Sequence, residues 1–253
     1  FVPPSCDPGP AMGGPRSIRR ANPDQGWIDL LYKAVGEGTR LLSRRREGEE
    51  LSLLGPIGEP FRPNPERPRS LLLGGGVGMP PMVFLAEHLK QLGGFKPLVL
   101  LGSEVPFPFR QHPSKIMVPG IPEGVISCMP LLEDWKIPSR LASLQGYPGC
   151  YEGYITDLAR CWLDGLDADQ RQQVEVFSCG PEPMLAAVAA MARDYDLPCQ
   201  VSLEEYMACA VGGCAGCVVE VETADGPAMQ RVCLFVPLFF PFPFFSFFLF
   251  PLF

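Results

Sequence analysis

The pattern of apolar and polar residues differs between two parts of the chain, and it changes after about a quarter of the chain's length. In the first part, residues 27–35 and 50–54 are expected to form strands, and a short basic helix is expected over residues 40–46 with Thr39 as its N-cap. The proline-rich residues 60–68 then have the composition of a linker. The first part therefore predicts a small β unit.

Beyond the linker, apolar strands alternate with amphipathic helices. In the helix expected over residues 80–92, Met82, Leu85 and Leu89 recur on one face, and Gly93 follows as a stop signal. Such alternation favours a parallel sheet that is covered by helices on both faces. The strands are expected at residues 69–73, 96–101 and 174–178, and the other helices at residues 154–163 and 182–195. The predicted fold class is multidomain, α/β together with β.

Composition narrows the class of protein further. The 253 residues are enough for two domains, or for two domains and a small appendage. The formal net charge of −7 argues against the basic surface that nucleic acids or anionic membranes would need. Ten cysteines without a recognisable secretory leader favour a reducing cytoplasm over a disulfide-stabilised secreted protein. The two histidines, His88 and His112, stand in unrelated contexts.

Four cysteines near the end of the chain carry the strongest chemical signal. Cys209, Cys214, Cys217 and Cys233 have the spacing C-x4-C-x2-C…C, which is the ligand pattern of plant-type 2Fe–2S clusters. The residues between the first three are only Gly, Ala and Val, small enough to let backbone N–H groups approach sulfur. A structural zinc site or two disulfides are the alternatives, but zinc sites usually pair their cysteines in short C-x2-C knuckles. The spacing therefore predicts a 2Fe–2S cluster.

A glycine-rich turn indicates a second site. Gly74, Gly75, Gly76 and Gly78 stand between an expected strand and an expected helix, where glycines let a pyrophosphate approach backbone N–H groups and the helix dipole. Pro81 occupies the place of the third glycine in the dehydrogenase fingerprint, and an ordinary tight turn is the alternative interpretation. The turn predicts nucleotide binding.

A second strand-to-helix turn is expected on the same carboxyl edge of the sheet. It is formed by Cys179, Gly180 and Pro181, and ligands of open α/β sheets collect along that edge. Cys179 is therefore the candidate catalytic residue, beside a nicotinamide ring, with a buried structural thiol as the alternative. The cysteines outside these motifs show no coherent spacing and are interpreted as packing residues or free thiols.

Together these motifs resemble one protein family. The nucleotide turn, the Cys-Gly-Pro strand end and the C-terminal cysteine spacing are similar to those of the ferredoxin-reductase superfamily. The segment VSLEEYMAC, residues 201–209, resembles the electron-transfer subunit of NAD-linked (type B) dihydroorotate dehydrogenase. The resemblance spans residues 15–233. It implies a truncated FAD-binding antiparallel β-barrel, a parallel-sheet α/β nucleotide domain and a small C-terminal 2Fe–2S domain.

The resemblance also implies a function. In this family a partner subunit that carries FMN oxidises dihydroorotate to orotate in pyrimidine biosynthesis, and electrons pass through the 2Fe–2S centre to FAD, which delivers hydride to NAD⁺. The chain would be the oxidoreductase electron-transfer subunit of a cytoplasmic heterotetramer, without a membrane or nucleic-acid partner. The alternatives are a reductase subunit of the sulfhydrogenase or glutamate-synthase type, a non-enzymatic zinc-binding protein, or the inactive product of a frame-shifted gene.

The motifs of the family map onto individual residues of this chain. Gly14 stands where the family has the arginine of its first flavin motif. By resemblance, the FAD contacts fall on Pro15, Arg16, Ser17, Leu31, Tyr32, Lys33, Gly38 and Thr39. The contacts to NAD fall on Gly74, Gly75, Gly76, Gly78, Cys179, Gly180 and Pro181, and the cluster ligands are Cys209, Cys214, Cys217 and Cys233.

Four segments are expected from these assignments. Residues 1–66 would form the partial FAD-binding barrel, residues 67–199 the NAD-binding α/β domain and residues 200–233 the 2Fe–2S domain. Residues 234–253 are rich in Phe and Pro and carry no charge. They are interpreted as an aberrant low-complexity tail that follows a reading-frame error, because the repeated prolines would break a membrane-spanning helix.

Overall fold

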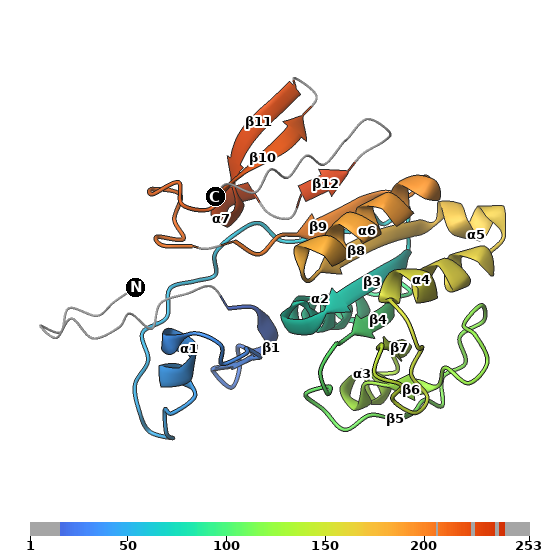
Figure 1. Ribbon diagram of the computed structural model, residues 1–253, viewed down its shortest axis with the longest axis horizontal. Coiled ribbons are helices and arrows are strands. Elements are labelled where there is room, and N and C mark those ends of the chain that lie inside the picture. Colours follow the sequence, from blue (N-terminus) through green and yellow to red (C-terminus); the bar gives the residue numbers. More distant parts are fainter. Residues whose placement is uncertain (1–15, 206, 224–225, 236–237, 241–253) are drawn as a thin grey trace, which may run out of the picture.

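The centre of the molecule is a six-stranded sheet. The computed structural model describes residues 16–205, 207–223, 226–235 and 238–240 (Figure 1). Five strands of the sheet are parallel, and β12 joins its edge antiparallel to β9, giving the order β12-β9-β8-β3-β4-β7. The strands are β3 (Arg69–Gly75), β4 (Leu98–Gly102), β7 (Ser139–Ala142), β8 (Val174–Cys179), β9 (Cys199–Ser202) and β12 (Leu238–Phe240).

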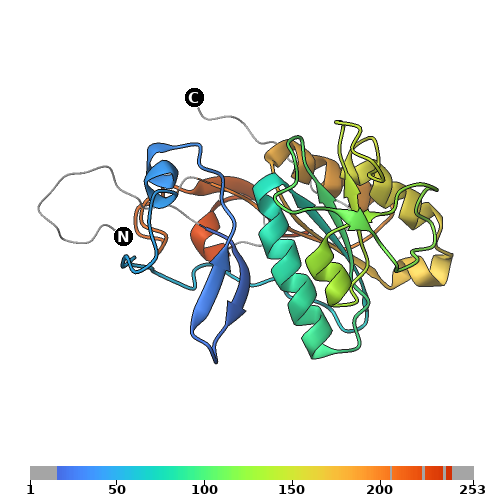
Figure 2. The ribbon, with the colours of Figure 1, turned by 90° about the horizontal axis from the view of Figure 1, so that it is seen from below.

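Helices cover both faces of this sheet, which confirms the layered architecture expected from the sequence. The helices α2 (Met79–Leu92) and α3 (Pro130–Asp134) lie on one face, and α4 (Ile155–Asp164) and α6 (Glu182–Asp194) lie on the other (Figures 1 and 2). The short α5 (Ala168–Gln172) connects α4 to β8.

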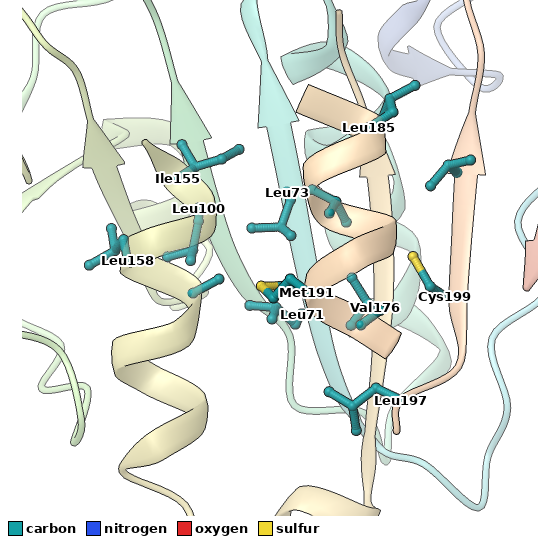
Figure 3. Packing of buried hydrophobic residues seen from close by; sticks show 14 of the residues in the cluster. Leu71, Leu73, Leu100, Ile155, Leu158, Val176, Leu185, Met191, Leu197 and Cys199 are labelled. Carbon is teal, nitrogen blue, oxygen red and sulfur yellow. The ribbon is translucent and has the colours of Figure 1, made fainter. Parts of the chain in front are cut away.

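Successive side chains of a strand point to opposite faces of the sheet and so pack in the two layers of the core in turn. In β3, Leu71 and Leu73 pack in the layer of α4 and α6, whereas Leu72 packs in the layer of α2. All three are fully buried. Figure 3 shows how Leu71, Leu73 and Val176 lie between the strands and the layer of α4 and α6. A strand that is buried on both faces must be apolar throughout, which explains the unbroken run of leucines.

The registers of the parallel strands bring several strand ends to one edge. Gly74 of β3 lies opposite Cys179 of β8, and Cys179 lies opposite Ser202 of β9. The turn after β3, the turn after β8 and the segment after β9 therefore begin side by side at the carboxyl edge of the sheet.

The N-terminal unit contains one hairpin and one short helix. The strands β1 (Ile18–Asn22) and β2 (Trp27–Leu30) pair antiparallel, and α1 spans Glu37–Leu42. Of the barrel that the resemblance implies, the described residues contain this one hairpin. The strand expected over residues 27–35 is shorter, and the strand expected over residues 50–54 is wrong: these residues are exposed and pair with no other strand among the described residues.

The short helix of this unit begins earlier than the sequence suggested. Its N-cap is Gly36, and the expected cap Thr39 lies in the first turn instead. The Thr39 hydroxyl accepts a hydrogen bond from the Gly36 N–H at 3.0 Å and lies 3.0 Å from the Gly36 carbonyl oxygen. Thr39 thus closes the helix start from three residues inside the helix, as the second residue of a capping box does.

One arginine joins the hairpin to the part of the chain that forms the six-stranded sheet. The Arg20 guanidinium lies 5.3 Å from the ring centre of Trp27 in β2 and 5.5 Å from that of Trp135, which directly follows α3. The strand β1 also packs on α2. Cation–π contacts of this kind are worth about 0.5–2 kcal/mol each. The Arg20 sandwich, in which the guanidinium lies between Trp27 and Trp135, therefore fixes the hairpin against the α2 side of the sheet.

The remaining elements lie in two smaller groups. The strands β10 (Val218–Thr223) and β11 (Gly226–Arg231) form a hairpin that α7 (Val232–Phe235) follows. The strands β5 (His112–Pro113) and β6 (Ser127–Cys128) form a short antiparallel pair.

Two of the expected boundaries can be set against these elements. The boundary expected between residues 199 and 200 falls inside β9. In the tail expected over residues 234–253, residues 234–235 belong to α7 and residues 238–240 form β12, whereas residues 236–237 and 241–253 lie outside the described residues. Among the helices that the structure describes, none has both the length and the apolar character required to cross a bilayer.

Candidate functional site

The glycine turn after β3 packs directly against the turn after β8. A Cβ atom added to Gly78 would overlap the carbonyl of Cys179 and lie 2.6 Å from the Gly180 nitrogen. Side chains at Gly75 or Gly180 would collide with Met184 of α6. These glycines let two backbone segments meet without side chains between them, which brings both predicted nucleotide motifs into one surface.

Gly76 differs from its neighbours in this turn. Its φ of +55° lies in the left-handed region that favours glycine, and no atom lies within 4 Å of the position that a Cβ would take. By contrast, a Cβ at Gly74 would lie 3.0 Å from the Met79 Cα. Among the glycines of the turn, Gly76 is therefore the one that faces open space, as contact with a bound pyrophosphate requires.

The start of α2 offers fewer hydrogen-bond donors than an ordinary helix. Pro80 and Pro81 have no N–H, and the Met79 N–H already donates to the Gly76 carbonyl. A phosphate at this turn would be stabilised by the helix dipole and by N–H groups of residues 76–78. The geometry fits a dinucleotide, and the assignment of these residues stays a prediction.

The candidate catalytic residue Cys179 lies inside the protein. Its side chain is 3% exposed and packs in the layer of α2. Burial raises the pKa of the thiol to about 12, and the nearby Glu204 carboxylate adds to the increase. At neutral pH the group is a neutral thiol, so it could act beside a nicotinamide by shape and polarity but not as a thiolate nucleophile.

We expect Cys179 to resist alkylation in the native protein. With a pKa of about 12, fewer than about one thiol in a thousand is ionised at pH 8. Iodoacetamide at pH 8, followed by peptide mass spectrometry, should label the half-buried Cys161 before Cys179, which should react only after denaturation. Rapid native labelling of Cys179 that NADH suppresses would contradict this picture and place the thiol in an open nicotinamide site.

Sequence reasoning missed two polar groups close to this thiol. Ser202, whose side chain interacts with Cys179, is its register partner in β9, and Glu204 follows two residues later. The Glu204 side chain reaches solvent, but protein atoms around its carboxyl group keep part of the water away. This desolvation raises the pKa of the carboxyl group. The period of two within β9 places Gln200 and Ser202 on one face, which the sequence could have revealed had this strand been predicted.

The predicted flavin residues lie in the N-terminal unit. The Arg16 guanidinium lies 5.8 Å from the ring centre of Tyr32, so the hairpin brings two of the three predicted segments together. Gly38 and Thr39 lie in the first turn of α1. Ser17 and Leu31 are half-buried, Lys33 is exposed, and Pro15 lies outside the described residues. An arginine, an aromatic ring and a glycine turn suit the phosphate and ring of a flavin nucleotide, and their assignment stays a prediction.

The four C-terminal cysteines are surrounded by backbone donors. The N–H of Cys214 points to the Cys209 sulfur at 3.3 Å, and that of Gly216 points to the Cys214 sulfur at 3.4 Å. The N–H of Cys233 points to the Cys217 sulfur at 3.5 Å. Donors from Val211, Cys214 and Gly213 lower the pKa of Cys209 to about 6. Ligation of iron requires thiolates, and N–H···S bonds stabilise them, so the donor set fits a 2Fe–2S cluster.

The cysteines form two pairs, Cys209 with Cys214 and Cys217 with Cys233. Pairs are what a two-iron centre needs, because each iron takes two of the four thiolates. The disulfides considered as an alternative are not formed, since all nine cysteines among the described residues are free. Within those residues, no three His, Cys, Asp or Glu side chains gather as a preformed site for a single metal ion.

Comparison with known proteins identifies the family. A sequence model described as the iron-sulfur cluster binding domain of dihydroorotate dehydrogenase B matches residues 204–239. The electron transfer subunit of dihydroorotate dehydrogenase B (NAD(+)) from Shouchella clausii is 32% identical over 228 residues, which are 89% of this chain and 76% of that protein. The chain belongs to this family of electron transfer subunits. The subunit from Caldanaerobacter subterraneus is likewise 32% identical, over 84% of this chain and 73% of its own length.

Solved structures support the fold of this family member. A chain from the structure of NADH-dependent reduced ferredoxin-NADP oxidoreductase superposes with a TM-score of 0.67 at 24% identity, covering 89% of this chain and 71% of its own. The ferredoxin reductase of carbazole 1,9a-dioxygenase gives a TM-score of 0.51 at 20% identity, over 74% and 54%. Both matches show a ferredoxin-reductase-like fold.

Proposed function

We propose that this chain is the electron-transfer subunit of an NAD-dependent dihydroorotate dehydrogenase and works in pyrimidine biosynthesis. The family supports this role, because the relatives at about 30% identity are named as that subunit. The observation that carries the proposal is the connection of the two sites. β9 ends at Ser202 beside the nucleotide turn, and the cysteine loop begins only seven residues later, at Cys209.

Electron transfer from the partner to NAD⁺ needs three groups: a 2Fe–2S cluster, a flavin and a nicotinamide. A different part of the chain would hold each of them. A 2Fe–2S centre moves single electrons, a nicotinamide accepts a hydride, and a flavin can do both and so connects them. The four cysteines would hold the cluster, and the glycine turn with Gly180 and Pro181 would hold NAD. Arg16, Ser17, Leu31, Tyr32, Lys33, Gly38 and Thr39, together with Pro15, would contact FAD.

The residues of the chain set the conditions for these transfers. The N–H groups of Cys214, Gly216 and Cys233 would spread the negative charge of the thiolates and so tune the potential of the centre. Gly76 would leave room for the pyrophosphate, and the Met184 side chain would close the wall behind Gly75 and Gly180. The neutral Cys179 thiol would keep charge away from the site of hydride transfer.

The proposal includes a partner and a compartment. The partner is a catalytic subunit that carries FMN and oxidises dihydroorotate, in a heterotetramer, because a subunit that only relays electrons needs a source of them. We place the complex in the cytoplasm, where reducing conditions keep thiols free for iron. A reductase subunit of the sulfhydrogenase or glutamate-synthase type would use the same residues and differ in its partner.

Co-expression tests the proposed function. The chain should co-purify with a dihydroorotate dehydrogenase catalytic subunit as a coloured complex, and the complex should reduce NAD⁺ when dihydroorotate is added. The catalytic subunit alone should reduce artificial acceptors but not NAD⁺. A colourless chain that binds zinc, or a complex that reduces NAD⁺ only with another donor, would contradict the proposal.

A further inference from the structure

The linker between the N-terminal unit and the sheet is fastened at several points. We define residues 61–67 as the linker strap. The Phe61 ring stands edge-on to Phe177 of β8, with ring centres 5.7 Å apart and an angle of 88°. Further along, the Arg67 side chain donates to the Val174 carbonyl at 3.1 Å. The strap therefore runs antiparallel to β8, across the face of the sheet that α2 also covers.

Two buried polar side chains bind the backbone of the strap. The Glu175 carboxylate accepts hydrogen bonds of 2.8 Å from the Asn64 N–H and from the Gln200 side-chain amide. The same Gln200 amide donates to the Arg62 carbonyl at 2.8 Å, and its oxygen accepts from the Arg62 N–H at 3.0 Å. Glu175 is 5% exposed and Gln200 is 1% exposed.

These four hydrogen bonds leave little freedom to the strap. A buried carboxylate or amide is costly unless its hydrogen bonds are satisfied, so the network favours one position of the strap strongly. A proline-rich linker is already semi-rigid as a free spacer. In this protein Pro63 and Pro65 flank the residue that Glu175 binds, which further restricts the backbone.

The network also lies between the three predicted sites. Toward the N-terminus, the strap leads to the hairpin and α1, which carry the predicted flavin residues. Along β8, Glu175 is followed on the same face by Phe177 and then by Cys179 at the nucleotide turn. Along β9, Gln200 precedes the segment that enters the cysteine loop.

We propose that Glu175 and Gln200 are positioning residues, which set the distance and orientation of the flavin unit relative to the nicotinamide site and the cysteine loop. They touch none of the reacting groups and act through the strap. This proposal rests on the proposed function. Hydride transfer requires the reacting atoms at about 3–3.5 Å, and a misplacement of about 1 Å can cost about a hundredfold in rate.

The chemistry of the network makes Glu175→Gln a sharp test. The carboxylate accepts from two donors, whereas an amide would point its own N–H₂ group at one of them. Rotating the Gln200 amide would only move this conflict to the Arg62 N–H. The swap Glu175→Gln with Gln200→Glu should relieve it in part. The amide introduced at position 175 can accept from the Asn64 N–H and donate to the carboxylate introduced at position 200, which restores three of the four bonds.

The experiment uses the full chain reconstituted with FAD and the cluster. In Glu175→Gln, amide hydrogen exchange at Arg62 and Asn64 should become about tenfold faster or more. Reduction of the flavin by NADH in stopped flow should slow by about tenfold, while the Kd for NADH changes by less than about threefold. The swap should recover part of both losses. Glu59→Gln is the matched control, because Glu59 pairs with Arg62 at the surface, outside the network.

The possible outcomes separate this proposal from the proposed function. Faster exchange with an unchanged rate of flavin reduction would show a purely structural network and overturn this proposal alone. Equal losses in Glu59→Gln, or no recovery in the swap, would overturn it as well. A wild-type chain that binds FAD but is not reduced by NADH would overturn the proposed function and, with it, this proposal. If Glu175→Gln fails to fold, the swap is compared with wild type instead. The proposal then expects the swap, which lacks one of the four hydrogen bonds, to show faster exchange at Arg62 and Asn64 together with slower reduction of the flavin.

Discussion

Replacing Cys217 by serine is expected to abolish the electron paramagnetic resonance signal of the dithionite-reduced protein. Cys217 is buried, and its sulfur receives the N–H of Cys233, so a serine cannot move to reach iron and binds it poorly. Loss of outer contacts to a metal ligand already costs about 10–100-fold in affinity or activity, so loss of a ligand should cost at least that. Dihydroorotate-dependent reduction of NAD⁺ by the complex should fall in parallel.

A matched control distinguishes this effect from the general loss of a thiol. Cys161 lies on α4, far along the chain from the cysteine loop, and is only half-buried. Cys161→Ser should leave both the signal and the activity unchanged. Cys214→Ser should behave like Cys217→Ser, although Cys214 is exposed. If Cys214 and Cys217 can both be replaced with the signal intact, the assignment of the cluster ligands is wrong.

Replacing Gly78 by alanine is expected to damage both the fold and NAD binding. The new methyl group would overlap the Cys179 carbonyl, and because the atoms it meets are all backbone atoms of Cys179 and Gly180, no side chain can rotate away to make room. Overpacking of this kind costs about 1–3 kcal/mol, and here the two turns that would hold the dinucleotide must separate. The free energy of unfolding should fall by that amount in urea titrations, and the Kd for NADH should rise about tenfold or more.

Gly76→Ala provides the contrast. Its methyl group would enter open space, so the fold should lose only the cost of a left-handed alanine, about 1–2 kcal/mol. The Kd for NADH should nevertheless rise, because that space is where the pyrophosphate is predicted to lie. Unchanged NADH binding in Gly76→Ala would place the dinucleotide elsewhere on the molecule.

The sequence predicted the sheet well where its signals were local. The leucines of β3, the glycine turn and the helix after it each carry a strong pattern within a few residues, and all three are present. The strand predicted over residues 50–54 was wrong, because an apolar pattern does not reveal whether a partner strand exists. The strand β12 was missed because the Phe- and Pro-rich composition of its segment hid the three residues that pair with β9.

The candidate sites show the same division. The cysteine loop was predictable because cluster ligands must have a fixed spacing, and three of the four lie within nine residues. The network of Glu175 and Gln200 was not, because its partners in the strap are 111 and 138 residues away along the chain. The sequence shows a glutamate inside an apolar strand, but only the fold shows that Asn64 and Gln200 donate the hydrogen bonds that its carboxylate needs.

The Arg20 sandwich has a spectroscopic consequence. The chain has three tryptophans, and two of them, Trp27 and Trp135, face the same guanidinium from different units. The third, Trp162, is buried in the core on the other face of the sheet. If the N-terminal hairpin separates from the sheet and its helices, the indole emission of the first two should change while that of Trp162 does not. Intrinsic fluorescence can thus follow the parting of the units separately from global unfolding, without an added label.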